Sequence, residues 1–331
     1  MKRILVIRGG AIGDFILTLP AVRALREAHP QAHLEILGYK HIAALAERRF
    51  YAQAVRYIEF GPLSAFFAKA GELPDELAKY FREFDLVVSY LYDPDDIFEN
   101  NLRRCGVKNF VRGPAKIRRG KHAAQQLAAP IEKLGMKAAD LAPKIFPSAE
   151  DRQFAAEFLR GLAVPAVALH PGSGSERKNW PVERWIELGD GFLAAESSKR
   201  SAALIVISGE ADTDQTAQLE ARWKNERVLF AKNLPLPRLA AVLEQTIFIG
   251  HDSGISHLAA ASGAECILLF GPTDPEIWAP QNANVRVIRA SSGRMENVDL
   301  GSVREAVGAA IADRGEKGAT DHALMRMGIS T

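Results

Sequence analysis

Short apolar runs alternate with longer amphipathic stretches along most of the chain. In the first half, apolar runs predict strands at 4–7, 33–37, 55–60, 86–91 and 107–111. Helical periodicity between them predicts helices at 15–28, 41–48, 63–81 and 123–134, the third broken at 71–74. Because strands and helices alternate, the pattern is typical of a parallel sheet with helices on its faces.

The same alternation starts again after two proline turns near residues 142–148. It predicts strands at 164–169, 203–208, 228–230, 247–249, 266–270 and 285–288, and helices at 149–162, 181–195, 213–223, 236–243, 255–261 and 303–312. We therefore expect two α/β domains, over 1–150 and 151–314, and a loosely held polar tail over 315–331. Ligands of such sheets bind beyond the carboxyl ends of the strands, so we expect the site in a cleft between the domains.

Composition narrows the class of protein. The chain has 331 residues, 47% hydrophobic and 25% charged, as in an ordinary globular protein. A net charge of +2 does not favour nucleic acid, and two distant cysteines give neither a disulfide framework nor a zinc pattern. Arg8 and Asp14 interrupt the first apolar run too early for a secretory signal. With no apolar run long enough to span a membrane, we expect a cytoplasmic protein, at most peripheral to a membrane.

The stretch 247–275 offers a candidate phosphate site. The predicted strand at 247–249 is expected to stop at Gly250, and Asp252 or Ser253 can cap the helix that follows. Free backbone N–H groups and the positive end of the helix dipole suit a phosphate or a diphosphate. An ordinary βαβ unit with polar turns explains the same residues.

Two further loops follow strands of the second half. Residues 170–181 are rich in glycine and serine and include Lys178, which suits an anion, although a flexible loop with a solvated lysine is the alternative. The loop is not a P-loop, because no Gly-Lys-Ser/Thr ending occurs. In the loop at 208–214, a carboxylate of Glu210, Asp212 or Asp214 could bind ribose hydroxyls or cap a helix.

The glycine-rich turn at 8–14 fails the test for a dinucleotide fingerprint. That fingerprint needs glycine where Arg8 stands and an acidic residue where Gly38 closes the second strand. Binding of NAD or FAD is therefore disfavoured. Asp14, in the first turn of the next helix, either complements the helix dipole or serves as a general base.

A basic run and an acidic turn remain open to several interpretations. No acidic residue lies between positions 100 and 131, where the basic residues are Arg103, Arg104, Lys108, Arg112, Lys116, Arg118, Arg119 and Lys121. This run is either a solvated face or a surface for an anionic acceptor or membrane, and it lacks the aromatic residues of a nucleic-acid site. The acidic turn at 93–96 could hold Mg²⁺ or Mn²⁺, but its composition is common in turns.

Three segments, in this order, resemble glycosyltransferase family 9, the family of ADP-heptose:lipopolysaccharide heptosyltransferases. They are Gly9–Ala21, the loop from His170 to Pro181, and Asp252–Ala261 followed by Phe270–Pro275. The resemblance implies a GT-B fold, in which two Rossmann-like domains with parallel sheets face each other across a cleft. It implies inverting transfer of a sugar from a nucleotide diphosphate sugar such as ADP-heptose, with no essential metal or other cofactor.

The resemblance also implies residue roles. Asp14 would be the general base, and Lys178 would neutralise the leaving diphosphate. The donor site would include Gly13, Ser173, Ser175, Gly209, Glu210, Asp252, Ser253, Gly254, His257 and Thr273. Which of the three carboxylates at 210–214 meets the ribose stays open.

The acceptor implied by the resemblance is an anionic glycolipid of lipopolysaccharide at the cytoplasmic face of the inner membrane. Its expected contacts are Arg103, Arg104, Arg112, Arg118 and Arg119. Two other functions are compatible with the same sequence patterns. One is a nucleotide-sugar epimerase or hydrolase of similar fold, which needs no acceptor; the other is a binding protein without catalysis.

Overall fold

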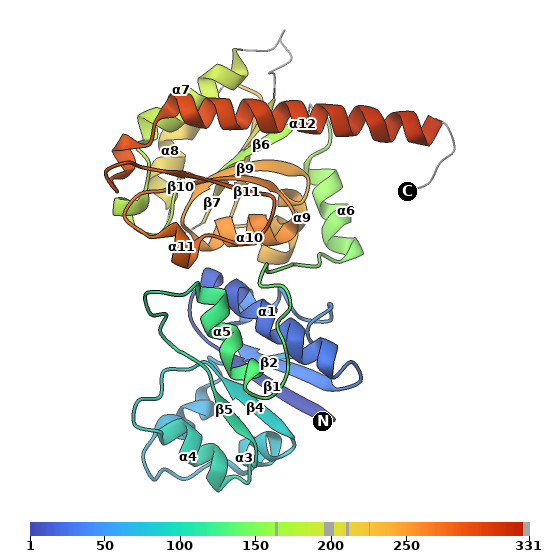
Figure 1. The fold of residues 1–331 in the computed structure, drawn as a ribbon, viewed down its shortest axis with the longest axis vertical. Coiled ribbons are helices and arrows are strands. Elements are labelled where there is room, and N and C mark those ends of the chain that lie inside the picture. Colours follow the sequence, from blue (N-terminus) through green and yellow to red (C-terminus); the bar gives the residue numbers. More distant parts are fainter. Residues whose placement is uncertain (163–164, 195–201, 210–211, 225, 327–331) are drawn as a thin grey trace. The chain divides into compact units, whose positions relative to one another are not determined.

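A computed structural model describes residues 1–162, 165–194, 202–209, 212–224 and 226–326, with side chains as far as residue 314 apart from Thr213. The chain divides into two compact units, Met1–Ser148 and Ala149–Thr331. Below they are called unit 1 and unit 2. Each unit is built around a parallel sheet of its own (Figure 1).

The sheet of unit 1 has the strand order β3-β2-β1-β4-β5, and every pairing is parallel. Its strands are β1 (Arg3–Arg8), β2 (His33–Gly38), β3 (Ala54–Tyr57), β4 (Leu86–Ser89) and β5 (Phe110–Arg112). The order reverses direction between β1 and β4. In such a sheet the loops at that switch point form the ligand crevice.

Helices cover both faces of this sheet. They are α1 (Ile12–Ala28), α2 (Lys40–Ala43), the 3-10 helix η1 (Gly61–Phe67), α3 (Asp75–Arg82), α4 (Ile97–Arg104) and α5 (Ala123–Glu132). Helices α1 and α5 pack together on one face, and α3 and α4 lie with η1 on the other (Figure 1). The central strands are buried on both faces, which explains their nearly continuous apolar runs.

Unit 2 repeats this arrangement with one strand more. Its sheet has the order β11-β10-β9-β6-β7-β8, again parallel throughout. The strands are β6 (Ala166–Leu169), β7 (Ala203–Ser208), β8 (Val228–Lys232), β9 (Thr246–His251), β10 (Glu265–Phe270) and β11 (Val285–Arg289). The switch point of this sheet lies between β6 and β9.

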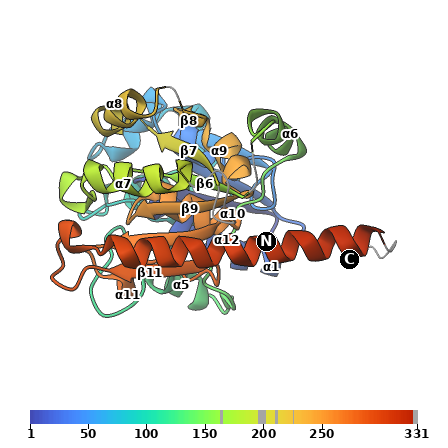
Figure 2. The ribbon, with the colours of Figure 1, turned by 90° about the horizontal axis from the view of Figure 1, so that it is seen from above.

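The helices of unit 2 form a layer on each face of its sheet. They are α6 (Ala149–Phe158), η2 (Glu176–Lys178), α7 (Val182–Leu193), α8 (Thr213–Arg222), α9 (Leu236–Leu243), α10 (Gly254–Ser262), α11 (Pro275–Trp278), η4 (Met295–Asn297) and α12 (Leu300–Arg326). Helices α7, α8 and α12 share a core with one face, and α9 and α10 cover the other (Figures 1 and 2). The long α12 runs across the first of these layers (Figure 2).

The structure corrects the predicted end of β9. The strand does not stop at Ile249 but continues through Gly250 and His251, which pair with Leu268 and Leu269 of β10. A Cβ atom at position 250 would lie 2.7 Å from the ring of Phe248. Glycine therefore lets the strand continue here rather than ending it.

Other element boundaries also differ from prediction. The pattern predicts no helix at α4, because its eight residues are mostly polar and charged. Helix α2 ends at Ala43 rather than at Arg48, and α12 continues to Arg326 rather than ending at Ala312. Among the residues that the structure describes, no helix has both the length and the apolar character that a membrane crossing requires.

Candidate functional site

In unit 1 the turn after β1 holds Asp14 by both carboxylate oxygens. The Arg8 guanidinium lies 3.2 Å from Asp14 Oδ1, and the Ala11 N–H donates to Asp14 Oδ2 at 3.1 Å. The Arg8 side chain is 5% exposed, whereas that of Asp14 is 36% exposed. The carboxylate is thus fixed from inside the protein and open to solvent on its outer side.

Glycine makes this close arrangement possible. Gly10 has φ +94°, and a Cβ atom there would lie 2.8 Å from Asp14 Oδ2. Arg8 lies over the ring of Tyr90 at 5.8 Å, and burial lowers the pKa of Arg8 although Asp14 and Tyr90 act in the opposite direction. Gly13 lies beside Asp14 in the first turn of α1. The arginine that breaks the dinucleotide fingerprint is thus the ion-pair partner of the candidate base.

In unit 2 the switch point brings together loops that are distant in sequence. Lys178, at the end of η2, donates from Nζ to the backbone oxygen of Asp252 at 2.8 Å and to its Oδ2 at 3.3 Å. The side chains of Lys178 and Asp252 are 25% and 12% exposed. The ammonium group therefore lies where β9 ends and α10 is about to begin.

The start of α10 has the geometry of an anion site. Ser253, not Asp252, is the N-cap, because its Oγ accepts the Ser256 N–H at 3.2 Å. The N–H groups of Gly254 and Ile255 precede this one, and in an α-helix they have no intrahelical acceptor. Together with the helix dipole they favour a negative charge. His257 is buried in the same helix.

Neighbouring loops add hydroxyl groups at the same edge of the sheet. After β6, Ser173 Oγ lies 2.9 Å from the backbone oxygen of Ser175 and 2.6 Å from Asn179 Oδ1. After β10, Thr273 Oγ1 is buried and has no hydrogen-bond partner within the described part of the chain.

The three acidic residues after β7 that could bind a ribose differ in their surroundings. Asp212 is buried, and its Oδ2 lies 3.1 Å from His170 Nε2 and accepts the Gly209 N–H at 3.2 Å. Burial raises the pKa of Asp212, but these two partners outweigh it and leave the pKa below its ordinary value. Asp214 is exposed in the first turn of α8, and Glu210 lies outside the described residues. The Asp212 carboxylate is thus committed to His170 rather than presented to a ribose.

His251 is another buried histidine, to which the sequence patterns assign no role. The Trp180 N–H donates to His251 Nε2 at 2.9 Å, and Nδ1 lies 3.5 Å from the Gly172 oxygen. Burial, and secondarily the neighbouring His170, lowers the pKa of His251 to about 3. The neutral ring therefore ties the loop after β6 to the end of β9. Its position directly after an apolar run was the only signal for it in the sequence.

Arginines of the basic run fall into two sets. Arg103 and Arg112 both bind the Glu99 carboxylate, at 2.7 and 2.6 Å, and Arg104 donates to Asn101 Oδ1 at 2.8 Å. Those three arginines belong to a network around α4. The second set, Arg118 and Arg119, is exposed in the loop between β5 and α5. That loop follows a carboxyl strand end, as the Asp14 turn does.

The acidic turn at 93–96 works within the same network. Asp93 accepts the N–H groups of Phe98 and Glu99 at 3.1 and 3.0 Å, and so caps the first turn of α4. Asp96 binds Arg112 at 2.6 Å. Within the described ranges no three His, Cys, Asp or Glu side chains gather as metal ligands would. The turn therefore has a structural explanation.

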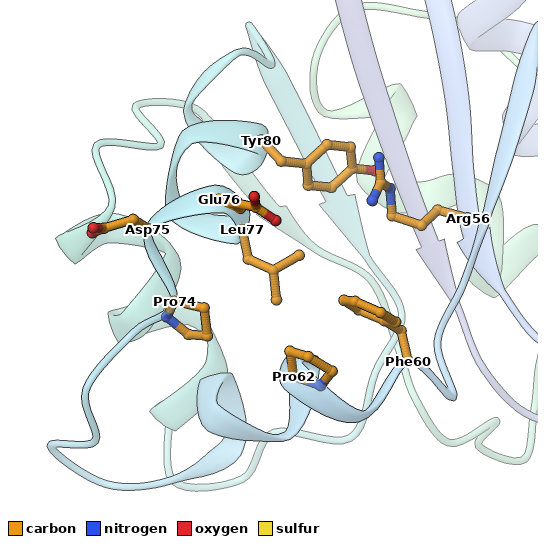
Figure 3. A pocket seen from close by; sticks show the side chains of 8 residues that line it. All are labelled: Arg56, Phe60, Pro62, Pro74, Asp75, Glu76, Leu77 and Tyr80. Atoms are coloured by element: carbon orange, nitrogen blue, oxygen red, sulfur yellow. The ribbon is translucent and has the colours of Figure 1, made fainter.

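A separate cavity of about 450 Å³ lies in unit 1 beside η1 and α3. In Figure 3, Leu77 points between Phe60 and the two prolines, and Arg56 and Tyr80 lie at the other end. Its lining residues are Arg56, Phe60, Pro62, Pro74, Asp75, Glu76, Leu77 and Tyr80. Arg56 stacks over the Tyr80 ring at 4.0 Å, and the Tyr80 hydroxyl donates to Glu35 at 2.6 Å. None of the predicted site residues lines this cavity.

Comparison with known families decides the class of the protein. Residues 107–307 match the model of the family described as glycosyltransferase family 9 (heptosyltransferase). The chain belongs to glycosyltransferase family 9. This family 9 enzyme is therefore a glycosyltransferase, and the matched range includes the Lys178 loop and α10.

Full-length relatives agree with this assignment. The glycosyltransferase is 23% identical over 317 residues to lipopolysaccharide heptosyltransferase 2 of Salmonella typhimurium, covering 88% of this chain and 89% of that protein. It is 25% identical over 294 residues to lipopolysaccharide heptosyltransferase 1 of Pseudomonas aeruginosa, covering 82% of this chain and 79% of that protein.

Solved structures show the same fold. The crystal structure of the glycosyl transferase family 9 protein from Veillonella parvula matches with a TM-score of 0.76 at 20% identity, covering 94% of this chain and 97% of that one. The ADP-heptose lipopolysaccharide heptosyltransferase II of E. coli matches with a TM-score of 0.75 at 17% identity, covering 95% and 100%. The fold is thus GT-B, as the resemblance to family 9 implies.

Proposed function

We propose that this glycosyltransferase transfers a heptose from ADP-heptose to the core of lipopolysaccharide, with inversion at the sugar carbon. Relatives named lipopolysaccharide heptosyltransferases support the substrate class, and solved structures of the similar E. coli heptosyltransferase WaaC contain ADP or ADP-2-deoxy-2-fluoro heptose. The observation that carries the proposal is the Lys178 ammonium beside the start of α10.

Unit 2 stabilises the leaving diphosphate in this proposal. Breaking the sugar–phosphate bond leaves negative charge on ADP, and the transition state is stabilised by groups that already face that charge. Lys178 turns from Asp252 toward the diphosphate, and the N–H groups of Gly254 and Ile255 meet a phosphate oxygen. Ser173, Ser253 and Thr273 supply further hydroxyl groups. With the charge matched in this way, the mechanism uses no bound metal.

Unit 1 supplies the base. Asp14 takes the proton from the acceptor hydroxyl as that oxygen attacks the sugar carbon. Its bonds to Arg8 and Ala11 fix the carboxylate in one orientation while its outer side stays exposed. A general base must be both positioned and accessible, and Asp14 meets both conditions.

The acceptor in this proposal is an anionic glycolipid at the cytoplasmic face of the inner membrane. Arg118 and Arg119 are the best placed of the five predicted arginines, because their loop lies at a carboxyl strand end. Arg103, Arg104 and Arg112 are bound to groups around α4. We therefore assign acceptor contact to the loop rather than to α4.

The test measures ADP release from ADP-heptose with heptose-deficient lipopolysaccharide as acceptor. Asp14→Asn is expected to lower kcat about 10³-fold, since general base catalysis contributes about 10²–10⁴-fold, and to leave ADP affinity unchanged. Asp75→Asn is the matched control, because Asp75 also lies in the first turn of a helix of unit 1. Unchanged turnover by Asp14→Asn would remove Asp14 as the base.

The leaving-group role has its own variant. Lys178→Met is expected to lower kcat/KM for ADP-heptose about 100-fold or more, whereas Lys232→Met, which removes an ion pair with Glu220, should not. Full donor kinetics in Lys178→Met would contradict the assignment. Acceptor-independent release of ADP at the same rate would make the protein a hydrolase instead.

A further inference from the structure

Three buried side chains form a chain of polar contacts behind the candidate diphosphate site. His170 follows β6, Asp212 lies at the start of α8, and Ser253 caps α10; they are 3%, 7% and 8% exposed. Asp212 Oδ2 lies 3.1 Å from His170 Nε2, and His170 Nδ1 lies 3.5 Å from Ser253 Oγ. The imidazole thus connects a carboxylate to the residue that caps the helix.

The hydrogen-bond directions follow from the groups present. Asp212 also accepts the Gly209 N–H, and its pKa lies below its ordinary value, so it is an ionised acceptor. His170 Nε2 must therefore carry a proton and donate it. Ser253 Oγ accepts the Ser256 N–H at 3.2 Å, and the Ser256 hydroxyl donates to the His251 oxygen. The Ser253 proton then has two acceptors, Ser256 Oγ at 3.1 Å and His170 Nδ1 at 3.5 Å.

The part of the chain that the structure describes places few other charges near the His170 ring. His251 of β9 is neutral because burial lowers its pKa to about 3, and Phe248 of the same strand stacks on His170 at 6.4 Å. Lys178 of η2 and Asp252 after β9 form an ion pair with each other. Asp212 is therefore the charged group in direct contact with the imidazole. An imidazole has two ring nitrogens, so while Nε2 donates to Asp212 the other nitrogen, Nδ1, is an acceptor that can still take up a proton.

We propose that His170 is a positioning residue that takes up a proton at Nδ1 when a diphosphate binds at the start of α10. The proton comes from the buffer, Asp212 stays ionised, and no covalent bond to carbon or phosphorus changes in this step. The Nδ1–H then donates to Ser253 Oγ. The Ser253 hydroxyl is left to donate its own proton to a phosphate oxygen.

The inference rests on the proposed function in one respect, that the anion at α10 is the diphosphate of the sugar donor. It adds a titratable charge to the fixed charge of Lys178. Since ligand binding and proton binding are linked, the affinity for ADP should rise as pH falls. A residue with a merely structural role would not produce this linkage.

The experiment counts the protons that the full-length protein takes up when it binds ADP. Calorimetric titrations at pH 7 in buffers of different ionisation enthalpy give that number as a slope. His170→Gln keeps an amide N–H for Asp212 but cannot be protonated, so it should take up fewer protons than the wild type. Its Kd for ADP should be about tenfold higher, as for loss of one charge-assisted hydrogen bond. Protonation of ADP itself contributes equally to both titrations.

Two further variants sharpen the result. Asp212→Asn keeps the shape of the side chain but removes the charge, and it should lose the extra proton uptake as well. His33→Gln is the matched control, because His33 pairs with Glu35 at 3.5 Å in unit 1, and it should titrate as the wild type does. If His170→Gln fails to fold, Asp212→Asn serves as the deciding variant.

The outcomes separate the two proposals. Equal proton uptake by wild type and a folded His170→Gln overturns the inference and leaves the proposed function intact. If the wild type does not bind ADP, the proposed function fails, and the same titrations with inorganic pyrophosphate test the inference alone. Pyrophosphate binding without extra proton uptake, or no binding of either ligand, overturns the inference as well.

Discussion

Gly172→Ala is the substitution for which the structure gives the sharpest expectation. A Cβ atom at position 172 would lie 1.6 Å from Asp212 Oδ1, whereas ordinary contacts begin at 3.4 Å. The carboxylate would have to retreat by about 2 Å to restore van der Waals contact. It would then leave both His170 Nε2 and the Gly209 N–H, which it now contacts at 3.1 and 3.2 Å.

The size of the effect follows from these contacts. Overpacking costs about 1–3 kcal/mol, and a hydrogen bond to a charged group contributes about 1.5–3 kcal/mol. The overpacking cost and the loss of hydrogen bonds are not independent, because moving the carboxylate relieves the first by causing the second. We therefore expect the unfolding free energy of unit 2 to fall by about 3 kcal/mol, less than the sum of the largest values. For a unit of this size that corresponds to a fall of roughly 6–12 °C in Tm.

Differential scanning calorimetry of the full chain is the suitable assay, because two units can unfold in separate transitions. Gly308→Ala is the control, since its Cβ would meet no atom within 4 Å and alanine is the better helix former. It should raise Tm slightly. An Asp212→Ala background removes the carboxylate but keeps a Cβ atom 2.8 Å from the new one, so Gly172→Ala should cost less there than in the wild type without becoming neutral. A Tm for Gly172→Ala within about 1 °C of wild type would refute the reasoning.

Three further predictions concern pH, the turn of unit 1 and the acceptor. Burial lowers the pKa of His251 from 6.5 to about 3. The neutral buried ring therefore contributes its full stability above pH 6.5, and this contribution is lost as pH falls, because the unfolded chain binds a proton first. The free energy of unfolding of unit 2, measured in urea, should fall by roughly 2 kcal/mol between pH 6.5 and 5. Gly10→Ala should lower kcat at least about tenfold, because its Cβ would displace the candidate base. Replacing Arg118 and Arg119 together by glutamine should raise the acceptor KM about tenfold and leave the donor KM unchanged.

Each of these has a control within the chain. His251→Gln should flatten the pH dependence of unfolding, and a slope equal to that of the wild type would exclude His251 as its source. Gly120→Ala shares the left-handed φ of Gly10, +96° against +94°, but its Cβ would meet no atom within 4 Å. It should therefore leave kcat unchanged. Arg103→Gln removes an exposed pair with Glu99, which contributes under about 1 kcal/mol, and an equal rise in acceptor KM there would contradict the assignment to the loop.

Much of the fold could be predicted because the local pattern and the sheet agree. Strand β7 (Ala203–Ser208) and helix α9 (Leu236–Leu243) have the predicted bounds, since each is a clear apolar or amphipathic stretch. The pattern failed where tertiary contacts decided the conformation. Gly250 has the sequence signature of a breaker, yet its pairing with Leu268 keeps it in the strand.

Part of the candidate site could likewise be predicted, because the sheet topology follows from the pattern of strands. The loops at 170–181 and 252–257 follow strands, so the topology brings them to one edge of the sheet. The contacts between them could not be read from spacing, because Lys178 and Asp252 are 74 residues apart. Asp212 shows the limit most clearly. The local sequence indicated that its carboxylate either caps a helix or binds a ribose. In the structure the carboxylate instead contacts His170, which is 42 residues away.

The Arg8–Asp14 ion pair also affects which of the two units a charged nucleotide mimic can bind. At the switch point of unit 1 the more exposed member of the ion pair is the carboxylate of Asp14, and Arg8 is buried. In unit 2 the more exposed member is Lys178, and its partner Asp252 is less exposed. The two sheets thus present surface charge of opposite sign at equivalent places. A diphosphate-based inhibitor should consequently engage unit 2 alone, whereas a compound with an ammonium group should be drawn to Asp14. The two sheets, alike in topology, thus differ in the sign of the ligand charge that each one favours.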